Sequence, residues 1–174
     1  MKKGTLVFIL VMIVSLVFSN ELVVYIYESL SWIEEGTIQK FEEINNCKVR
    51  VVKLVDSGNV LTRLILEKKN PRADVIIGLD QALTLKAKEE NLLIPYKPNN
   101  INKIKDPSLI MDQDYYVVPF DYGAIAIIYD PEKIQDELIS FEDITKYKNS
   151  LLIEDPRTSS PGQSFLLWTI AVYQ

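Results

Sequence analysis

Stretches rich in β-branched and aromatic residues alternate with helix-like stretches along the first half of the chain. We expect strands at residues 22–27, 48–55 and 74–78, and the first of these is apolar on both faces, which is typical of a strand buried in a parallel sheet. Residues 31–45 and 60–69 have helical periodicity and lie between the strands. This order predicts an α/β fold with a parallel-type sheet flanked by helices.

The first of these helices is amphipathic. Ile38, Phe41 and Ile44 share one stripe, and charged side chains lie off it. We therefore expect residues 31–45 to cover the sheet with that stripe.

The second half of the chain is less regular. A helix is expected from Asp80 to about residue 90, a surface loop over residues 95–114, and a bent crossover over residues 116–129, where a proline and a glycine interrupt the apolar run. The remaining expected elements are a short helix opening at Asp130-Pro131, a helix capped by Ser140, a strand at residues 151–153, and a last helix begun by Ser160-Pro161.

The first 19 residues have the layout of a signal peptide. Lys2 and Lys3 give a positive start, and residues 6–18 are mainly apolar. An uncleaved anchor is the alternative, but this run is shorter than the roughly 17–25 residues that span a bilayer. We expect cleavage near Asn20 and a periplasmic or extracytoplasmic protein.

Composition excludes several classes of function. The formal charge is −5 with no basic cluster downstream of the signal, which disfavours nucleic acid as a partner. The chain has no histidine and one cysteine, Cys47, which disfavours zinc chemistry and histidine-based hydrolysis and leaves no internal disulfide.

Polar and aromatic side chains follow five successive expected strands. In a parallel sheet, the carboxyl ends of the strands and the helix N-termini beside them form the usual ligand site. Carboxylates and aromatic faces there suit a cation with a flat ring, and a helix start at Ser159 or Ser160 suits an anion or an acceptor oxygen. Each residue also has a local alternative: Ser57, Asp80 and Ser160 fit as helix caps, and Tyr27 fits as a core aromatic.

No catalytic signature accompanies these side chains. The sequence contains no nucleophile-base pair, Walker loop or dinucleotide glycine fingerprint. We expect a binding protein and not an enzyme, with no cofactor and no metal.

Four segments resemble one known family. VYIYESL at 24–30, RLILEKKNPRADVIIGLD at 63–80, VPFDYGAIAIIYD at 118–130 and EDPRTSSPGQSFLLW at 154–168 are similar to the periplasmic thiamine-binding proteins of ABC transporters, a branch of the type II solute-binding proteins. ADVIIGLD alone also looks like ferric-iron and polyamine relatives. The resemblance implies two α/β lobes that close on thiamine or its phosphates and deliver it to an ABC permease in the inner membrane.

The resemblance also implies the ligand-binding residues and the division into lobes. Residues 20–120 would form the first lobe, 121–130 the hinge or crossover, and 131–174 the start of an incomplete second lobe, because similar proteins run to about twice this length. The ligand-binding residues would be Tyr27, Trp32, Asp56, Ser57, Asp80, Asp121, Tyr122, Thr158, Ser159 and Ser160.

Other interpretations stay open. This chain departs from some members of the family at one place, because they carry a close cysteine pair where it has Asn45-Asn46-Cys47.

The alternative functions are a ferric-iron or other small-solute binding protein of the same fold, an enzyme of thiamine or pyrimidine metabolism with Cys47 as nucleophile, and a non-functional remnant of an interrupted gene. A half-built second lobe would expose apolar surface and lead to aggregation or to pairing with a partner that supplies the rest.

Overall fold

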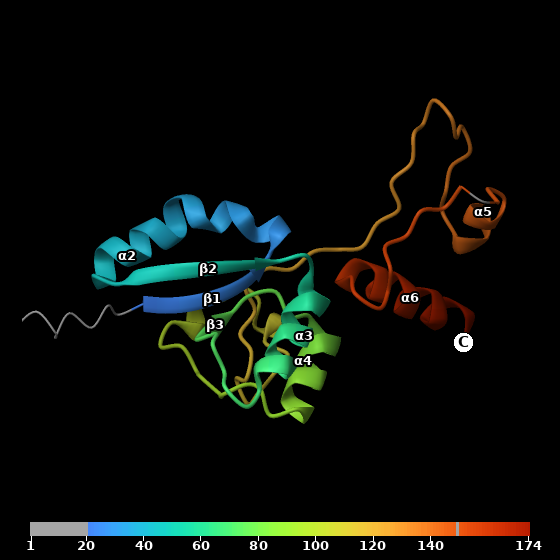
Figure 1. Ribbon diagram of the computed structural model, residues 1–174. Helices are drawn as coiled ribbons and strands as arrows, with labels where there is room; N and C mark the ends of the chain where they lie inside the picture. The colour runs from blue at the N-terminus through green and yellow to red at the C-terminus, as the bar shows by residue number, and fades with distance from the viewer. Residues whose placement is uncertain (1–20, 149) are drawn as a thin grey trace, which may run out of the picture.

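The structure, a computed structural model, describes residues 21–148 and 150–174 (Figure 1). The predicted signal peptide lies outside the described residues. The strands are β1 (Glu21–Tyr27), β2 (Lys48–Leu54) and β3 (Val75–Ile76). The α-helices are α2 (Gln39–Asn45), α3 (Ser57–Glu67), α4 (Gln81–Glu89), α5 (Phe141–Thr145) and α6 (Ser160–Tyr173). Shorter helical segments are η1 (Glu28–Ile33), η2 (Glu34–Ile38), η3 (Ile101–Lys103) and η4 (Pro107–Leu109).

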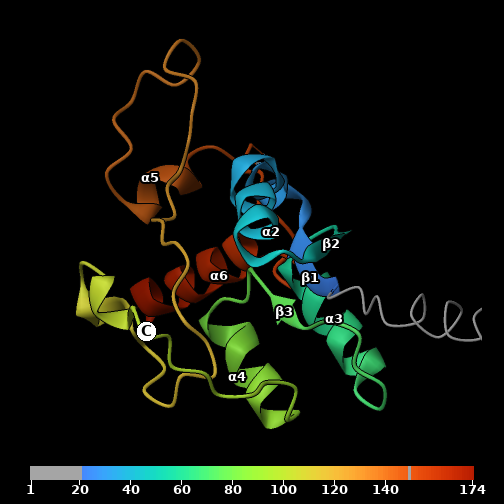
Figure 2. The same ribbon diagram turned by 90° about the vertical axis from the view of Figure 1, so that its left-hand side faces the viewer.

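The three strands form a parallel sheet, as the sequence predicted, and their order is β2-β1-β3. The register pairs Tyr27 with Leu54, so β1 and β2 end side by side. Successive side chains of the central strand point to opposite faces. Val24 and Ile26 therefore pack with η1, and Val23 and Tyr25 pack with α3. Figures 1 and 2 show α2 on one face of the sheet and α3 on the other.

The expected helix over residues 31–45 forms differently. A 3-10 segment (η1), a π-helical segment (η2) and α2 follow one another, and Gly36 (φ 87°) breaks the helical path inside η2. Leu30 and Ile33 are buried, whereas Phe41 and Ile44 of the predicted stripe stay 44% and 71% exposed. The prediction was wrong for a continuous helix, because the backbone leaves helical geometry at Glu35 and Gly36. Of the predicted stripe, Ile38 packs against the core below it, and Phe41 and Ile44 are not part of that core cluster.

The helices α3 and α4 occur as predicted. Each begins at an aspartate. Asp56 Oδ1 accepts a hydrogen bond from the backbone N–H of Asn59, and Asp80 Oδ1 accepts one from the backbone N–H of Leu83. The N–O distance is 2.8 Å in both. The loop at residues 95–114 is confirmed, with only η3 and η4 inside it. Near the end of this loop, Asp112 forms an ion pair with Lys88 of α4, with 2.7 Å between Nζ and Oδ1.

Two of the later expectations are wrong. Asp130-Pro131 opens a turn and not a helix, and residues 151–153 belong to no strand. Residues 151–153 form no strand because a β-strand needs a second strand to hydrogen-bond with. Within residues 21–148 and 150–174, only β1, β2 and β3 pair with one another. The crossover at 116–129 bends at Tyr116 and Val117 and also forms no strand with any described residue.

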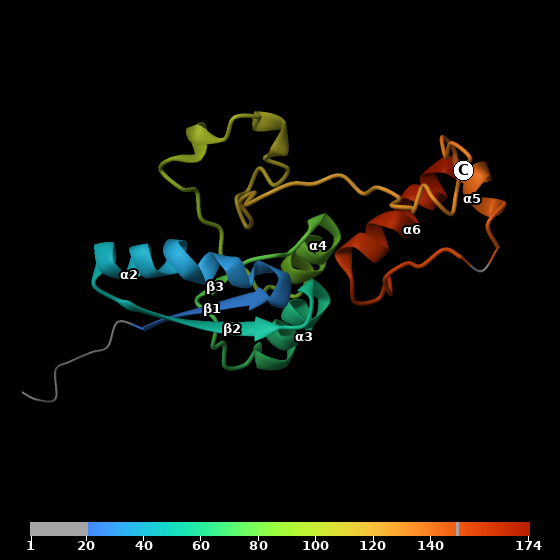
Figure 3. The same cartoon turned by 90° about the horizontal axis from the view of Figure 1, so that it is seen from above.

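The last two helices stand beside the sheet body. Ser140 caps α5 as predicted, and α6 follows at the end of the sheet where β1 and β2 end (Figures 1 and 3). The cap of α6 is Ser159, one residue earlier than expected, and Ser160 is its first residue. Within the described part of the chain, none of the helices is both long and apolar enough to cross a membrane.

Candidate functional site

The N-termini of α3 and α6 meet at the carboxyl edge of the sheet. The hydroxyl oxygens of Ser57 and Ser160, the first residues of these helices, lie 2.7 Å apart. The backbone N–H of Gly58 donates to the carbonyl oxygen of Thr158 over 3.3 Å. Ser57 is 5% exposed and Ser160 is half-buried, so one side of this contact is still open to solvent. Residues about a hundred positions apart in sequence are thus brought together.

Glycine at position 58 makes this approach possible. A Cβ atom there would lie 2.7 Å from the Thr158 carbonyl oxygen and 3.1 Å from its Cα. Both are backbone atoms and cannot swing aside as a flexible side chain does. The close approach of the two helix starts therefore depends on the missing side chain of Gly58.

Three of the predicted site residues act as helix caps. Asp56 and Asp80 cap α3 and α4, and the Ser159 hydroxyl accepts from the Gly162 N–H over 3.2 Å at α6. Ser159 also donates a hydrogen bond to the Glu154 carboxylate. All three oxygens accept hydrogen bonds from otherwise free N–H groups at the helix starts, and the two carboxylates also offset the partial positive charge there. The alternative interpretation of Asp80 as a helix cap is therefore confirmed. The same interpretation named Ser57 and Ser160 as caps, but the caps of α3 and α6 are the preceding residues, Asp56 and Ser159.

Tyr27 lies at the same edge, at the end of β1. Its ring rests on Gly78, where an added Cβ would lie 2.5 Å from the Tyr27 Cδ1. Gly78 has a φ of 111°, a conformation that side-chain-bearing residues rarely adopt. Burial raises the pKa of the Tyr27 hydroxyl, and the negative charge of Asp121 raises that pKa further. Tyr27 therefore remains a neutral phenol near neutral pH, close to the Asp121 carboxylate.

Trp32 and the crossover form a second contact next to this one. The Trp32 ring stacks on Phe120, with centroids 6.3 Å apart and planes inclined by 27°. Both rings are open to solvent, with exposed fractions of 62% and 52%. Tyr122, two residues further on, is 82% exposed and makes no aromatic contact among the described residues.

The arrangement offers two kinds of recognition chemistry. Aromatic faces and the Asp121 carboxylate suit a flat cation, and the paired serine hydroxyls at two helix N-termini suit an acceptor oxygen or an anion. Within the described residues, no three His, Cys, Asp or Glu side chains come close enough together to hold a metal ion.

The sequence interpretation missed two residues of this edge. Phe120 lies inside the PFDYG motif, and its place beside Asp121 was the available signal. Gly78 follows a buried strand, where a glycine often marks a close approach. Asp80 was named, but its carboxylate is committed to α4 and no hydrogen bond joins it to the other predicted residues in the described part of the chain.

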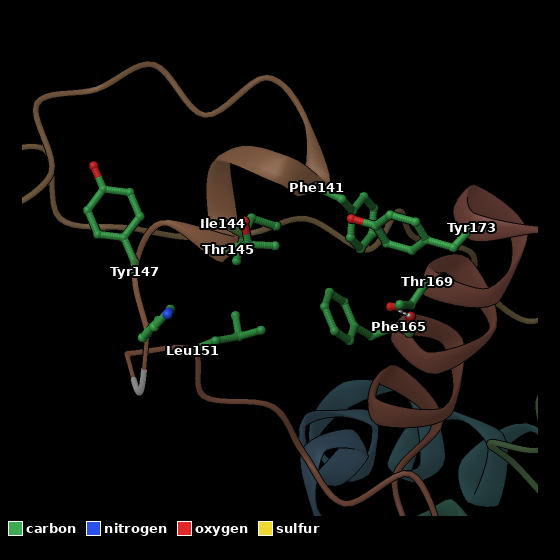
Figure 4. A pocket seen from close by; sticks show the side chains of 9 residues that line it. Phe141, Ile144, Thr145, Tyr147, Leu151, Phe165, Thr169 and Tyr173 are labelled. Atoms are coloured by element: carbon green, nitrogen blue, oxygen red, sulfur yellow. Dashed lines mark hydrogen bonds between the residues drawn. The ribbon is translucent and has the colours of Figure 1, made fainter.

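A separate hollow lies between α5 and α6 (Figure 4). It has a volume of about 240 Å³ and includes none of the predicted ligand-binding residues. Figure 4 shows the rings of Phe141 and Tyr173 side by side at its edge, with Leu151 across from Phe165. Its lining is almost entirely apolar, unlike the sheet edge.

Comparisons with known proteins agree with this architecture. The chain matches the family model of bacterial extracellular solute-binding proteins over residues 70–171. It is 36% identical over 157 residues to the thiamine-binding periplasmic protein of Salmonella typhimurium, which is 87% of this chain and 47% of that protein. Over 159 residues it is 32% identical to the protein of the same name from Brucella abortus, which is 88% of this chain and 47% of that protein. The resemblance seen in the sequence is confirmed.

A solved structure supports the fold. The periplasmic binding protein AfuA from Actinobacillus pleuropneumoniae, with exogenous fructose-6-phosphate bound, superposes with a TM-score of 0.58 at 24% identity. The match covers 81% of this chain and 47% of that chain. The chain therefore spans about half the length of the relatives it matches. Since the family match takes in more than half of the chain, from just before β3 into α6, the chain belongs to the bacterial extracellular solute-binding protein family.

Proposed function

We propose that this chain is part of the substrate-binding component of an ABC importer and that it takes up thiamine or its phosphates in the periplasm. The proposal draws its ligand from the names of the relatives, which are thiamine-binding periplasmic proteins 32–36% identical to this chain. The periplasmic location is inferred from the same relatives. The membrane permease is inferred from the sequence resemblance to binding proteins of ABC transporters.

In this proposal, residues 20–120 are the first lobe, 121–130 the hinge region and 131–174 the start of the second lobe. Tyr27, Trp32 and Tyr122 offer aromatic faces to the flat, positively charged ligand, and Asp121 supplies the opposite charge. An aromatic face stabilises a cation by about 0.5–2 kcal/mol. Asp56 and Asp80 hold the first-lobe helix starts in place through their caps.

The serine-rich helix starts would receive the other end of the ligand. Ser57, Thr158 and Ser160 meet where two helix N-termini converge, and Ser159 caps the second of them. Hydroxyl groups and free N–H groups at such a point stabilise a phosphate or a hydroxyl oxygen. The observation that carries the proposal is this convergence of the α3 and α6 N-termini beside Tyr27, at the edge where α/β folds bind ligands.

Calorimetric titration with thiamine tests the proposal. The folded chain should give saturable heat at one thiamine per chain, with no turnover of the ligand. Replacing Trp32 with leucine should weaken binding about 2- to 30-fold, because one aromatic face is lost. Tyr96→Leu is the matched control, because Tyr96 is an exposed aromatic side chain outside the predicted site. A folded chain that gives no heat with thiamine would overturn the proposal.

A further inference from the structure

One carboxylate holds the start of the crossover at residues 116–129. Asp112 Oδ2 accepts hydrogen bonds from the backbone N–H groups of Tyr116 and Val117, over 2.6 Å and 3.2 Å. Within the described part of the chain, these are the only hydrogen bonds that the backbone of residues 116–129 makes. Asp112 is therefore the polar anchor of the backbone that leads to the predicted site.

The same carboxylate is joined to helix α4. Its Oδ1 atom lies 2.7 Å from Nζ of Lys88, and the Asp112 side chain is only 11% exposed. Lys88 Nζ also lies 4.8 Å from the centre of the Tyr116 ring, a cation–π contact with the same segment. Burial raises the pKa of the Asp112 carboxyl, but the hydrogen bonds from Lys88 and from the two backbone N–H groups outweigh burial and lower that pKa. Asp112 thus stays charged near neutral pH and links α4 to the crossover.

The turn in front of the crossover is strained and well fixed. The backbone N–H of Tyr115 donates to the carbonyl oxygen of Asp112 over 3.2 Å, and Tyr115 has a φ of 58°, which is uncommon for a bulky residue. Such a conformation persists only where the surrounding structure holds it. Here the Tyr96 N–H donates to the Tyr115 carbonyl over 2.8 Å, and Lys97 Nζ lies 4.8 Å from the centre of the Tyr115 ring. The turn brings the Asp112 carboxylate back to N–H groups further along the chain.

We propose that Asp112 is a positioning residue, which sets where Phe120 and Asp121 lie at the edge of the sheet. Val117 is the last residue whose backbone Asp112 holds, and Phe120 follows it by no more than about 10 Å of extended chain. Fixing the first therefore restricts the second, whose ring stacks on Trp32. The role of Asp112 in ligand binding rests on the proposed function, whereas its role in placing the crossover does not.

The first test needs no ligand. The chain has two tryptophans, so Trp168→Phe leaves Trp32 as the only one. Acrylamide quenching of its fluorescence then reports whether Phe120 covers the Trp32 ring. Phe120→Ala in the same background gives the quenching of an uncovered ring and calibrates the scale.

Two variants that remove the same charge are compared in that background. Asp112→Asn has one amide oxygen where the carboxylate uses two, one for Lys88 and one for the backbone, so quenching should rise towards the Phe120→Ala value. Asp114→Asn is the matched control, because Asp114 is 76% exposed and lies 3.8 Å from the same lysine. Its quenching should equal that of the background.

Thiamine titration is the second test. Asp112→Asn should raise the Kd for thiamine about threefold or more, because only molecules with the crossover in place bind well, and Asp114→Asn should bind as the parent does. A parent chain that ignores thiamine would overturn the proposed function, and quenching alone would then decide the role of Asp112. Equal quenching in the two variants, or equal Kd values where the parent binds, would overturn the positioning role.

A further variant covers a failure to fold. Circular dichroism establishes whether each variant is folded. If Asp112→Asn is not, Lys88→Met takes its place, because it removes the ammonium group and leaves Asp112 with its two backbone partners. Quenching of Trp32 should still rise in this variant, and unchanged quenching would contradict the link from α4 to the crossover.

Discussion

Two glycines hold the predicted site residues in contact. Gly58 lets the Thr158 carbonyl approach the start of α3, and Gly78 lets the Tyr27 ring rest on the backbone after β3. At both positions a neighbouring group fills the space that a side chain would take, so the absence of a side chain matters as well as the flexibility of the glycine backbone. At this scale, close packing decides which substitutions the edge of the sheet tolerates.

Replacing Gly58 with valine should separate the starts of α3 and α6. The new side chain meets backbone atoms of Thr158, so we expect a loss of about 1–3 kcal/mol in the free energy of unfolding. Gly123→Val is the control, since nothing lies within 4 Å of a Cβ there. Chemical denaturation of both variants measures the difference, and equal midpoints would contradict the contact.

Replacing Gly78 with alanine should be more costly than the same change at Gly36. Both glycines have positive φ values, 111° and 87°, so both variants carry backbone strain. Only at Gly78 does the new methyl group also meet the Tyr27 ring. We expect an additional loss of about 1–3 kcal/mol at Gly78, measured by thermal or chemical unfolding. If Gly36→Ala were the more damaging, the Tyr27 contact would be wrong.

At the scale of elements, caps rather than long periodic patterns define where the helices begin. Helix α5 is only five residues long, and a reciprocal capping box joins Ser140 to Asp143. Such a short helix has little intrinsic stability, so its end contacts decide whether it forms. The hydrogen bond from Lys146, followed by those from Ser140 and the Ile139 N–H, lowers the pKa of Asp143 from 3.8 to about 2.

The charge state of Asp143 should make α5 sensitive to acid. A carboxylate whose pKa is lower in the folded chain stabilises it above the ordinary pKa, and this contribution disappears as the pH falls from about 4 towards about 2. Carboxyl-carbon NMR should report the low pKa of Asp143. In Lys146→Met, which removes the largest cause, that pKa should rise. An unchanged pKa in this variant would contradict the assigned cause.

On the scale of the whole molecule, burial is uneven. The core lies around β1, where Val24, Tyr25 and Ile26 are 5%, 2% and 0% exposed and both neighbouring strands are hydrogen-bonded. The crossover and the region from α5 to α6 lack a comparable core. Local stability follows such differences in burial and hydrogen bonding.

Amide hydrogen exchange should divide the chain accordingly. We expect the amides of β1 to exchange roughly a thousandfold or more slowly than those of residues 124–129. The peptide covering α6 should give an intermediate value, because its helical hydrogen bonds are formed but its side chains are exposed. Mass spectrometry of digested peptides measures this. Similar protection at β1 and at 124–129 would show that the crossover is paired in solution.

Much of the first lobe was predictable because its signals are local. The residues of β1 are apolar on both faces, Asp56 and Asp80 stand at helix starts, and Asn70-Pro71 follows α3, so each element could be located from a short window. The wrong predictions involve longer range. Gly36 breaks an otherwise helical pattern, and residues 151–153 have strand composition without a strand to join. The lobe boundaries and the ligand-binding role of the ten site residues remain predictions.

The amino-acid sequence alone determined the parallel α/β order, the approximate starts of the helices and the family resemblance, since these depend on spacing and side-chain chemistry within short segments. Tertiary structure decided which site residues meet. Ser57 contacts Ser160, Asp121 acts on Tyr27, and Phe120 stacks on Trp32 across separations of about 90 residues or more, which no local pattern specifies. It also decided that 124–129 and 151–153 stay unpaired, because a strand exists only where a second strand completes its hydrogen bonds.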